Sequence, residues 1–470
     1  MQDGLKAARR RRFHCAIGLT LLATLSLSVQ AGAATKVRMV KDITPGSADS
    51  SPKGFESLGE ILLFGASRSD ADVDKLWRSD GTASGTQRIE RIWPQYMTRF
   101  GRRVFFAASD ASHSDELWKT DGTAAGTKLV KDIIPGGDGS YPIGFQKVGR
   151  ALFFQAAGRQ APSAAQDREL WKSDGTRAGT KLVKDINPGI EGSYPDHLTN
   201  VRGTLFFITR YGSHIGLWRS DGTQAGTKLL KAISTDPGRP HIRDLKGFHG
   251  KLFFQIRGGT HGVELWKSDG TVKGTKIVKT IRPDRESNRS LHFETAGGRL
   301  FFAADDGVHG TEPWKSDGTR AGTKLLKDIS RGPSQSYPMW ARIAFRGKLY
   351  FSAARPGHGQ GLWESDGSRA GTRLIKTIDP RSPRVTGLSL IDLTRVGSSL
   401  FFEGDDPVHG YELWKSNGTR AGTRMVVDIN PGSDPHDDSS YPSSLTNVAG
   451  TLLFGADDGI HGRELWKAVP

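Results

Sequence analysis

Seven of the 13 histidines occupy one position of a recurring segment, four or five residues before a tryptophan and often within a DDGxHG stretch. They are His113, His214, His261, His309, His358, His409 and His461. Imidazole binds metals and transfers protons near neutral pH, so these residues are candidates for a functional site. The ligands of one metal ion must converge to within about 2 to 2.2 Å of it. Histidines spread over seven repeats cannot do so, and we expect local turn contacts from them.

A second recurring group is the tyrosine of an SYP segment, at Tyr141, Tyr194, Tyr337 and Tyr441. A tyrosine beside proline in a loop can stack on a sugar or contact another protein, because its ring is apolar and its hydroxyl is polar. The alternative is packing against the neighbouring repeat. The histidines and these tyrosines together define the candidate binding face.

One acidic insertion, SDPHDDSS at residues 433–440, stands apart from the repeat. Asp434, His436, Asp437 and Asp438 offer ligands of the kind that bind Ca²⁺, but their spacing matches no EF-hand loop. We therefore predict neither a metal nor any other cofactor. No nucleophile with an adjacent base and no carboxylate pair departs from the repeat, so we assign no catalytic residue.

The elements that would position these side chains are set by a repeat of about 50 residues. Its phrase LWKSDGTRAGTKLVKDINPG begins at Leu170 and recurs with small changes along the chain. The repeating tryptophans are Trp77, Trp118, Trp171, Trp218, Trp266, Trp314, Trp363, Trp414 and Trp466; Trp93 and Trp340 lie outside the series. A period of this length is typical of a propeller or a solenoid.

Each period contains four short apolar pieces separated by turn residues, including an Asp-Gly hairpin signal. Four antiparallel strands per period make a propeller blade. The chain begins on a fourth strand, residues 37–43, and stops on a third strand, residues 464–467, so the two partial units complete one blade. A solenoid would instead need polar caps at its ends. The sequence therefore predicts an all-β closed propeller of nine four-stranded blades, with seven or eight blades as the alternative.

Closure of the ring should join the two ends of the chain. Within complete repeats, a glutamate two residues before tryptophan and a lysine two before isoleucine form pairs such as Glu116 with Lys131. We expect these charges to face each other on neighbouring strands. Across the break, the corresponding pair is Glu464 with Lys41.

Loop lengths vary in only part of the repeat. The distance from tryptophan to the isoleucine that ends the fourth strand is constant, whereas the fourth-to-first and second-to-third connections change in length. In an antiparallel blade these two connections emerge on the same face. Variable loops on a rigid scaffold commonly carry binding, so this face is the predicted working surface.

The first 33 residues have the pattern of a signal peptide, with four arginines at residues 9–12, an apolar stretch and small residues near Ala31 and Ala33. We predict that residues 34–470 form one propeller domain that is secreted or held at the cell surface or in the periplasm. Cys15, the only cysteine, lies in the leader. No later segment is apolar enough to span a membrane. The net charge of +16 includes +4 from the leader, and the remainder is spread evenly, as for ordinary solubilising charge.

The chain resembles the bacterial ELWxxDGT repeat family, often labelled hyalin-like, through ELWKTDGT at Glu116, ELWKSDGT at Glu169 and Glu264, and ELWKSNGT at Glu412. The resemblance implies export and a repeat architecture, and it implies no activity. We expect a monomeric binding or structural module that acts in adhesion, surface attachment or recognition of a glycan or protein. Nucleic acid is not an expected partner of an exported protein. The alternative is a polysaccharide-active hydrolase or lyase on the same scaffold.

Overall fold

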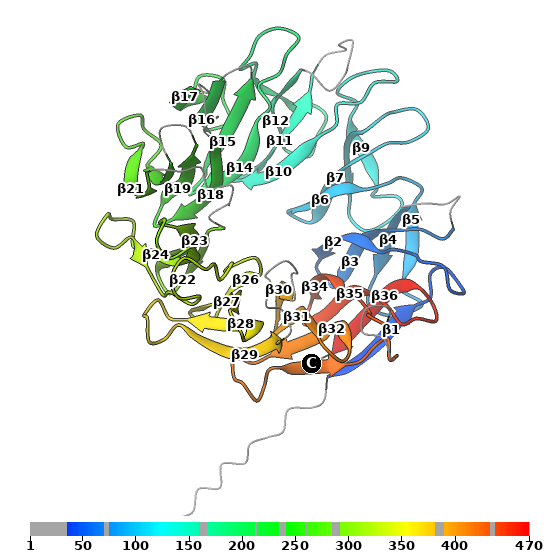
Figure 1. The fold of residues 1–470 in the computed structure, drawn as a ribbon. Helices are drawn as coiled ribbons and strands as arrows, with labels where there is room; N and C mark the ends of the chain where they lie inside the picture. Colours follow the sequence, from blue (N-terminus) through cyan, green and yellow to red (C-terminus); the bar gives the residue numbers. More distant parts are fainter. Residues whose placement is uncertain are drawn as a thin grey trace, which may run out of the picture. The chain divides into compact units, whose positions relative to one another are not determined.

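The computed structural model describes residues 35–469, apart from 70–74, 159–166, 212–213, 235–240, 259–261, 284–291, 381–389 and 433–437. Residues 35–470 form one compact unit. Its strands make nine four-stranded antiparallel sheets, which are the nine blades of a β-propeller (Figure 1). The described residues contain no helix that could cross a membrane. The predicted all-β fold and its nine blades are confirmed.

The first three blades in chain order are β2 (Lys53–Leu58), β3 (Ile61–Ala66), β4 (Lys75–Ser79) and β5 (Gln87–Glu90); β6 (Gln95–Phe100), β7 (Arg103–Ala108), β8 (Glu116–Thr120) and β9 (Lys128–Lys131); and β10 (Ile143–Val148), β11 (Ala151–Ala157), β12 (Arg168–Ser173) and β13 (Lys181–Lys184). The next three are β14 (Asp196–Val201), β15 (Thr204–Tyr211), β16 (His214–Ser220) and β17 (Lys228–Ser234); β18 (His241–Phe248), β19 (Lys251–Arg257), β20 (Val263–Ser268) and β21 (Lys276–Arg282); and β22 (Glu294–Ala296), β23 (Arg299–Asp305), β24 (Thr311–Ser316) and β25 (Lys324–Leu325). The last three are β26 (Arg342–Phe345), β27 (Lys348–Arg355), β28 (Gly359–Ser365) and β29 (Arg373–Asp379); β30 (Leu390–Val396), β31 (Ser399–Asp406), β32 (Gly410–Ser416) and β33 (Arg424–Val427); and β34 (Ser443–Val448), β35 (Thr451–Asp457), β36 (Arg463–Val469) and β1 (Lys36–Lys41).

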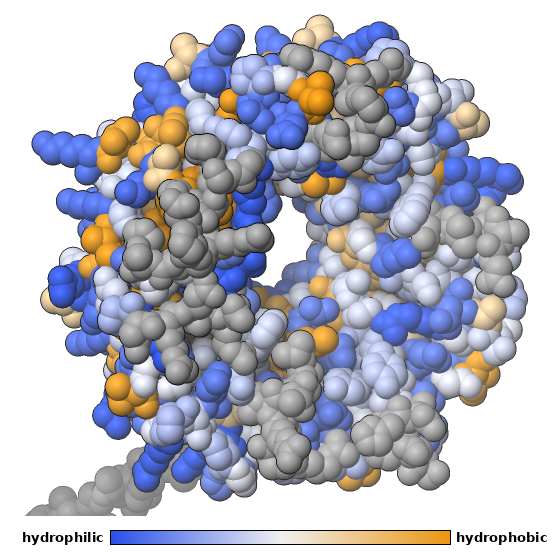
Figure 2. Space-filling view, turned by 45° about the horizontal axis from the view of Figure 1, so that its top comes forward, coloured by the Kyte–Doolittle hydropathy of each residue, from blue (hydrophilic) through white to orange (hydrophobic). Residues whose placement is uncertain are grey.

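The first strand of each blade lies innermost and the fourth lies at the outer rim (Figure 1). Successive inner strands such as β2, β6, β10 and β14 contact one another around the ring. Figure 2 shows the opening at the centre of this ring.

The ends of the chain complete the last blade. Strand β1 pairs antiparallel with β36, with Met39 opposite Trp466 and Lys41 opposite Leu465, and the sheet order is β1-β36-β35-β34. This pairing confirms the predicted closure, and it excludes the alternatives of seven or eight blades. The pairing also covers the edge of β36, which would otherwise be free, and free strand edges are sites of aggregation.

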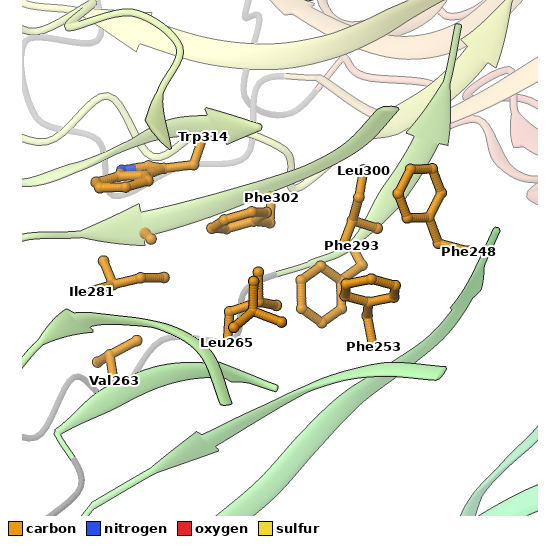
Figure 3. Packing of buried hydrophobic residues seen from close by; sticks show 11 residues of the cluster. Phe248, Phe253, Val263, Leu265, Ile281, Phe293, Leu300, Phe302 and Trp314 are labelled. Atoms are coloured by element: carbon orange, nitrogen blue, oxygen red, sulfur yellow. The ribbon is translucent and has the colours of Figure 1, made fainter. Parts of the chain in front are cut away.

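The core consists of apolar layers between neighbouring blades. In the layer between the β18–β21 and β22–β25 blades, Phe253 and Leu265 pack with Phe302 and Trp314 (Figure 3). The rings of Phe302 and Trp314 are stacked, with centroids 6.3 Å apart and planes 25° from parallel. The LFF segment or a close variant, together with the repeat tryptophan, supplies such side chains in each repeat, which explains why each period needs large apolar residues. Burial of each such side chain stabilises the fold by about 1.5 to 3 kcal/mol.

Lysines at two positions of the repeat join several blades to the next one. Lys172, which follows the repeat tryptophan, donates a hydrogen bond of 2.7 Å to the carbonyl of Gly222 in the next blade. Lys184 donates one of 3.0 Å to the carbonyl of Thr227, and its ammonium lies 5.7 Å from the ring centroid of Trp218. Equivalent bonds recur around the ring. Part of the basic excess therefore serves blade packing rather than ligand binding or solubility alone.

The predicted pairing of glutamate with lysine is wrong. Glu464 accepts hydrogen bonds from the backbone amides of Ile43 and Thr44, whereas Lys41 donates one of 2.8 Å to the carbonyl of Thr86 in the next blade. The reason is a shift of register between Met39 and Lys41, which places Lys41 opposite Leu465. Such an irregularity changes the side on which the following side chains emerge, so the two charges diverge.

The hairpins between the third and fourth strands are nearly identical from blade to blade. In the first, Asp80 Oδ1 accepts hydrogen bonds from the amide and the hydroxyl of Thr82, at 2.9 and 2.6 Å. The hydroxyls of Ser79 and Thr86 are 2.7 Å apart beneath it. The glycine of each turn has a positive φ, such as 91° at Gly175, where other residues are strained. The SDGT segment is thus a turn that joins two strands.

Candidate functional site

The second-to-third loops and the fourth-to-first connections lie together on one face. Ser114 Oγ donates a hydrogen bond of 2.7 Å to the carbonyl of Gly137, and the amide of Tyr141 donates one of 2.9 Å to the carbonyl of Asp115. Across the chain ends, the amide of Arg463 donates one of 2.7 Å to Asp49 Oδ1. These contacts confirm that the histidine loops and the SYP segments share a face.

The described histidine side chains of this face make local contacts. In four loops the imidazole Nδ1 lies 2.8 to 3.0 Å from the carboxylate of the aspartate three residues earlier, at His113, His309, His409 and His461. The carboxylate of Asp306 raises the pKa of His309, and that of Asp458 raises the pKa of His461. The expected local turn role is met, with an aspartate carboxylate as the partner.

The other candidate residues do not form a common cluster among the residues that the structure describes. His358 donates its backbone amide to the carbonyl of Arg355, and His214 begins β16. His261 lies outside the described residues, as do Asp434, His436 and Asp437 of the acidic insertion; Asp438 is half-buried. Among the residues that the structure describes, no three histidines or carboxylates are placed to hold a metal.

The glutamate of the ELW phrase holds the SYP connection in place. Glu116 accepts hydrogen bonds from the amides of Ile133 and Ile134 and from both the amide and the hydroxyl of Ser140. The same arrangement recurs at Glu169, Glu312, Glu412 and Glu464. Burial raises the pKa of Glu312, Glu412 and Glu464 to about 7. The residue after each anchored serine then has a left-handed φ, such as 47° at Tyr141. Sequence reasoning missed this role of the glutamate. A signal for it exists, because glycine replaces the glutamate at Gly216 and Gly361, and the connections that follow these two blades also lack the SYP serine.

Two of the four SYP tyrosines meet at one cavity. A pocket of about 270 Å³ lies where three successive blades adjoin, and its lining includes Tyr96, Tyr141 and Tyr194. The other lining residues are Gln95, Ala107, Asp115, Pro142, Ile143, Gln155 and Arg168. Tyr441 lies elsewhere, stacked on Tyr411 with ring centroids 5.3 Å apart, and Tyr337 is half-buried in the connection before β26. The structure therefore separates the predicted tyrosine group into different environments.

The polar side chains of this pocket differ in their hydrogen bonds. The guanidinium of Arg168 donates a hydrogen bond of 3.1 Å to the carbonyl of Tyr141 and lies 5.7 Å from the ring centroid of that tyrosine. Gln95 Nε2 donates one of 3.0 Å to Asp115 Oδ2. Gln155 is only 6% exposed, and it lines the pocket. The pocket thus combines aromatic rings with one amide that has both a donor and an acceptor to offer.

Sequence reasoning missed Tyr96 and Gln155. Tyr96 belongs to the inner strand β6 and has a φ of 57° at a shift of register between Gln95 and Thr98. Gln155 follows the apolar run of β11 at a position that is Ala107 and Ile208 in the adjacent blades. A comparison of equivalent repeat positions for unusual polar residues could have found Gln155.

No family model and no curated protein matches the chain. Solved structures with a similar backbone include a puromycin hydrolase mutant complexed with PGG, at 12% identity and a TM-score of 0.43, over 89% of this chain and 60% of that one. They also include a Mycobacterium tuberculosis puromycin-hydrolyzing peptidase, at 10% identity and a TM-score of 0.44, over 89% and 60% of the two chains. A third belongs to a study of two prolyl endopeptidases, at 11% identity and a TM-score of 0.42, over 77% and 55%. The chain thus spans about 60% of the length of the first of these structures, and the likeness gives no information about its activity.

Proposed function

We propose that this protein is an exported recognition module that binds a glycan or protein through the face that carries the histidine loops and the SYP connections. One observation carries the proposal. The aromatic side chains that are at least 43% exposed among the described residues all lie in a fourth-to-first connection or at the start of the strand that follows. They are Trp93, Tyr96, Trp340 and Tyr441. Exposed aromatic residues that gather on one surface are characteristic of binding sites.

The opposite face supports the same assignment by contrast. It carries the SDGT hairpins, whose hydrogen bonds repeat from blade to blade. Its exposed apolar residues are single aliphatic side chains such as Val272. Trp93 and Trp340 are also the two tryptophans that the repeat does not require. Because no packing role demands them, we assign them to binding.

Export and membership of the ELWxxDGT family are part of this proposal. The N-terminal pattern of arginines and apolar residues supports export, and the ELWKSDGT phrases support the family. Comparing the mass of the protein in culture supernatant and periplasm with that of the full chain tests export, because cleavage near Ala33 removes the leader.

Binding is tested with a printed glycan array probed with the exported chain, its W93A and W340A variants, and the control V272A from the opposite face. We expect selective glycan binding that W93A or W340A weakens and V272A leaves unchanged. Absence of binding to any glycan would contradict the glycan form of the proposal. Binding that V272A weakens as much as W93A would contradict the choice of face.

A second candidate, a polysaccharide-active hydrolase, is favoured by Glu403 in β31. This glutamate is 6% exposed, and burial, followed by the nearby charge of Asp392, raises its pKa to about 8. A carboxyl that keeps its proton at neutral pH can act as a general acid. Release of reducing ends from polysaccharides, lost in E403Q and kept in E264Q, would favour this function over simple binding.

A further inference from the structure

We propose that the pocket lined by Tyr96, Tyr141, Tyr194 and Gln155 binds a single uncharged pyranose ring of a glycan. This inference rests on the proposed recognition function and names the ligand class of one site on that face. Throughout, the pocket means the cavity of about 270 Å³ between the β6–β9, β10–β13 and β14–β17 blades.

The three tyrosines come from two connections and the start of one inner strand. Tyr141 and Tyr194 follow the anchored serines Ser140 and Ser193, and Tyr96 stands at the start of β6. All three have left-handed backbone conformations, with φ values of 57°, 47° and 48° for Tyr96, Tyr141 and Tyr194. Equivalent positions of other blades have the same conformation, such as Ser444 for Tyr96 and Tyr441 for Tyr141 and Tyr194, so the repeat itself fixes the backbone that carries these tyrosines. Tyr96 is also 58% exposed, so its ring is open to a ligand. An aromatic ring beside an apolar sugar face is a favourable contact.

Gln155 supplies the directional part of the site. Gln155 lines the pocket with only 6% of its surface exposed, and the equivalent positions Ala107 and Ile208 show that the fold accepts an apolar residue there. Its amide offers two N–H donors and one carbonyl acceptor on adjacent atoms. One hydroxyl of a sugar ring can accept a hydrogen bond from an amide N–H, and the neighbouring hydroxyl can donate one to the amide carbonyl. Gln155 therefore provides the pattern that recognises a vicinal diol.

The charges that line the pocket favour a neutral ligand. Asp115 accepts a hydrogen bond from Gln95, and Arg168 donates to the carbonyl of Tyr141, so the one carboxylate and the one guanidinium balance. Burial lowers the pKa of Arg168, because the protein solvates its charged form less well than water does. An acidic sugar would meet the Asp115 carboxylate, and a basic sugar would meet Arg168.

The volume limits the ligand to about one ring. Pockets for drug-sized ligands usually have about 300 to 1,000 Å³, and this cavity is slightly smaller. A terminal or branching sugar of a glycan therefore fits better than an internal stretch of several residues. An aromatic side chain of a protein partner is the competing occupant, and it becomes an outcome of the test.

The test uses methyl α-D-glucopyranoside, methyl α-D-mannopyranoside and methyl β-D-galactopyranoside as probes, with binding measured by NMR titration of the intact exported chain. The variants are Q155M, which keeps the side-chain length without its polar atoms, and Y96A. The matched control is Q255M. Gln255 occupies the equivalent position of β19 and is fully buried, and its amide has no partner among the described residues. It does not line the pocket.

We expect at least one glycoside to bind, with affinity reduced tenfold or more by Q155M and Y96A and unchanged by Q255M. Q255M should melt at the wild-type temperature or above it, because it removes a buried amide that has no partner among the described residues. Q155M should melt at the wild-type temperature, because the adjacent blades accept an apolar residue at this position. A fall in melting temperature with Q155M alone would show that the amide has a structural partner, and it would overturn the argument from Gln155.

Other outcomes also overturn the inference. If none of the three glycosides binds while the glycan array is positive, recognition is real but this pocket is not its site for a neutral ring. If D-glucuronate or D-glucosamine binds more tightly than the neutral probes, the ligand class is wrong. If N-acetyl-tyrosinamide alone binds, the pocket takes an aromatic side chain. If no glycan on the array and none of the glycosides binds, both the inference and the glycan form of the proposed function are wrong.

Discussion

Glu464 Oε2 accepts a hydrogen bond of 2.9 Å from the backbone amide of Ile43, a residue 421 positions away in the sequence. The same carboxyl group accepts hydrogen bonds from the amide and the hydroxyl of Ser50. In other blades the equivalent glutamate accepts hydrogen bonds from residues 17 to 28 positions further along the chain. At the break, this repeated local anchor therefore becomes a link between the two ends of the chain.

Replacing Glu464 with alanine should destabilise the protein by about 2 to 4 kcal/mol, because the buried amides of Ile43 and Ser50 lose their acceptor. The free energy of unfolding in urea measures the effect. Glu264→Ala is the control, since Glu264 Oε2 accepts from Trp266 Nε1 instead. Equal losses in the two variants would show that the connection does not depend on the anchor.

Removing residues 464–470 should open the ring. Deletion takes away β36, which leaves the edges of β1 and β35 without a partner. Exposed strand edges promote aggregation, so we expect a lower melting temperature and soluble aggregates. Thermal denaturation followed by light scattering measures both. An unchanged melting temperature would mean that β36 does not close the ring.

The lysine contacts between blades should each contribute measurably to stability. Lys172→Met removes the hydrogen bond to Gly222 and should reduce the free energy of unfolding by about 1 to 2 kcal/mol, as expected for a charged donor at a partly buried site. The exposed Lys181 in β13 of the same blade is the matched control. If K181M is as destabilising as K172M, general charge effects outweigh the contact with the next blade.

Stability should fall as the pH rises through the range in which the buried glutamates ionise. Burial raises the pKa of Glu312, Glu412 and Glu464 to about 7 and that of Glu403 to about 8, from the ordinary 4.5. The folded state then holds these protons more tightly than the unfolded state. Their contribution is fully present below about pH 4.5 and is lost as the pH rises to between 7 and 8.

Urea denaturation at intervals from pH 4.5 to pH 8.5 measures this dependence. The E403Q variant should flatten the upper part of the curve, because its neutral amide does not ionise. A wild-type free energy of unfolding that rises from pH 5 to pH 8 would contradict the sign of the effect.

Much of the fold could be predicted because each blade is encoded locally. The spacing between successive repeat tryptophans, such as Trp171 and Trp218, indicates one blade per period. The partial units at the two ends predict closure of the ring. The constant tryptophan-to-isoleucine distance likewise marked the rigid hairpin, whose turn is closed by bonds within SDGT. Such features depend on residues a few positions apart, so the order of residue types is enough to reveal them.

The pocket and the glutamate anchors depend on contacts that the order of residues does not contain. Lys41 and Glu464 diverge because the register shifts by one residue at Met39, and sequence periodicity does not report such a shift. Tyr96, Tyr141 and Tyr194 line one pocket because the start of β6 and two connections from successive blades meet on one face, and Gln155 of β11 lines the same pocket. The repeat sets how many blades form and which loops share a face. Which side chains of different blades meet is decided by the curvature of the ring and by the irregularities of its inner strands, and both arise only when the blades pack.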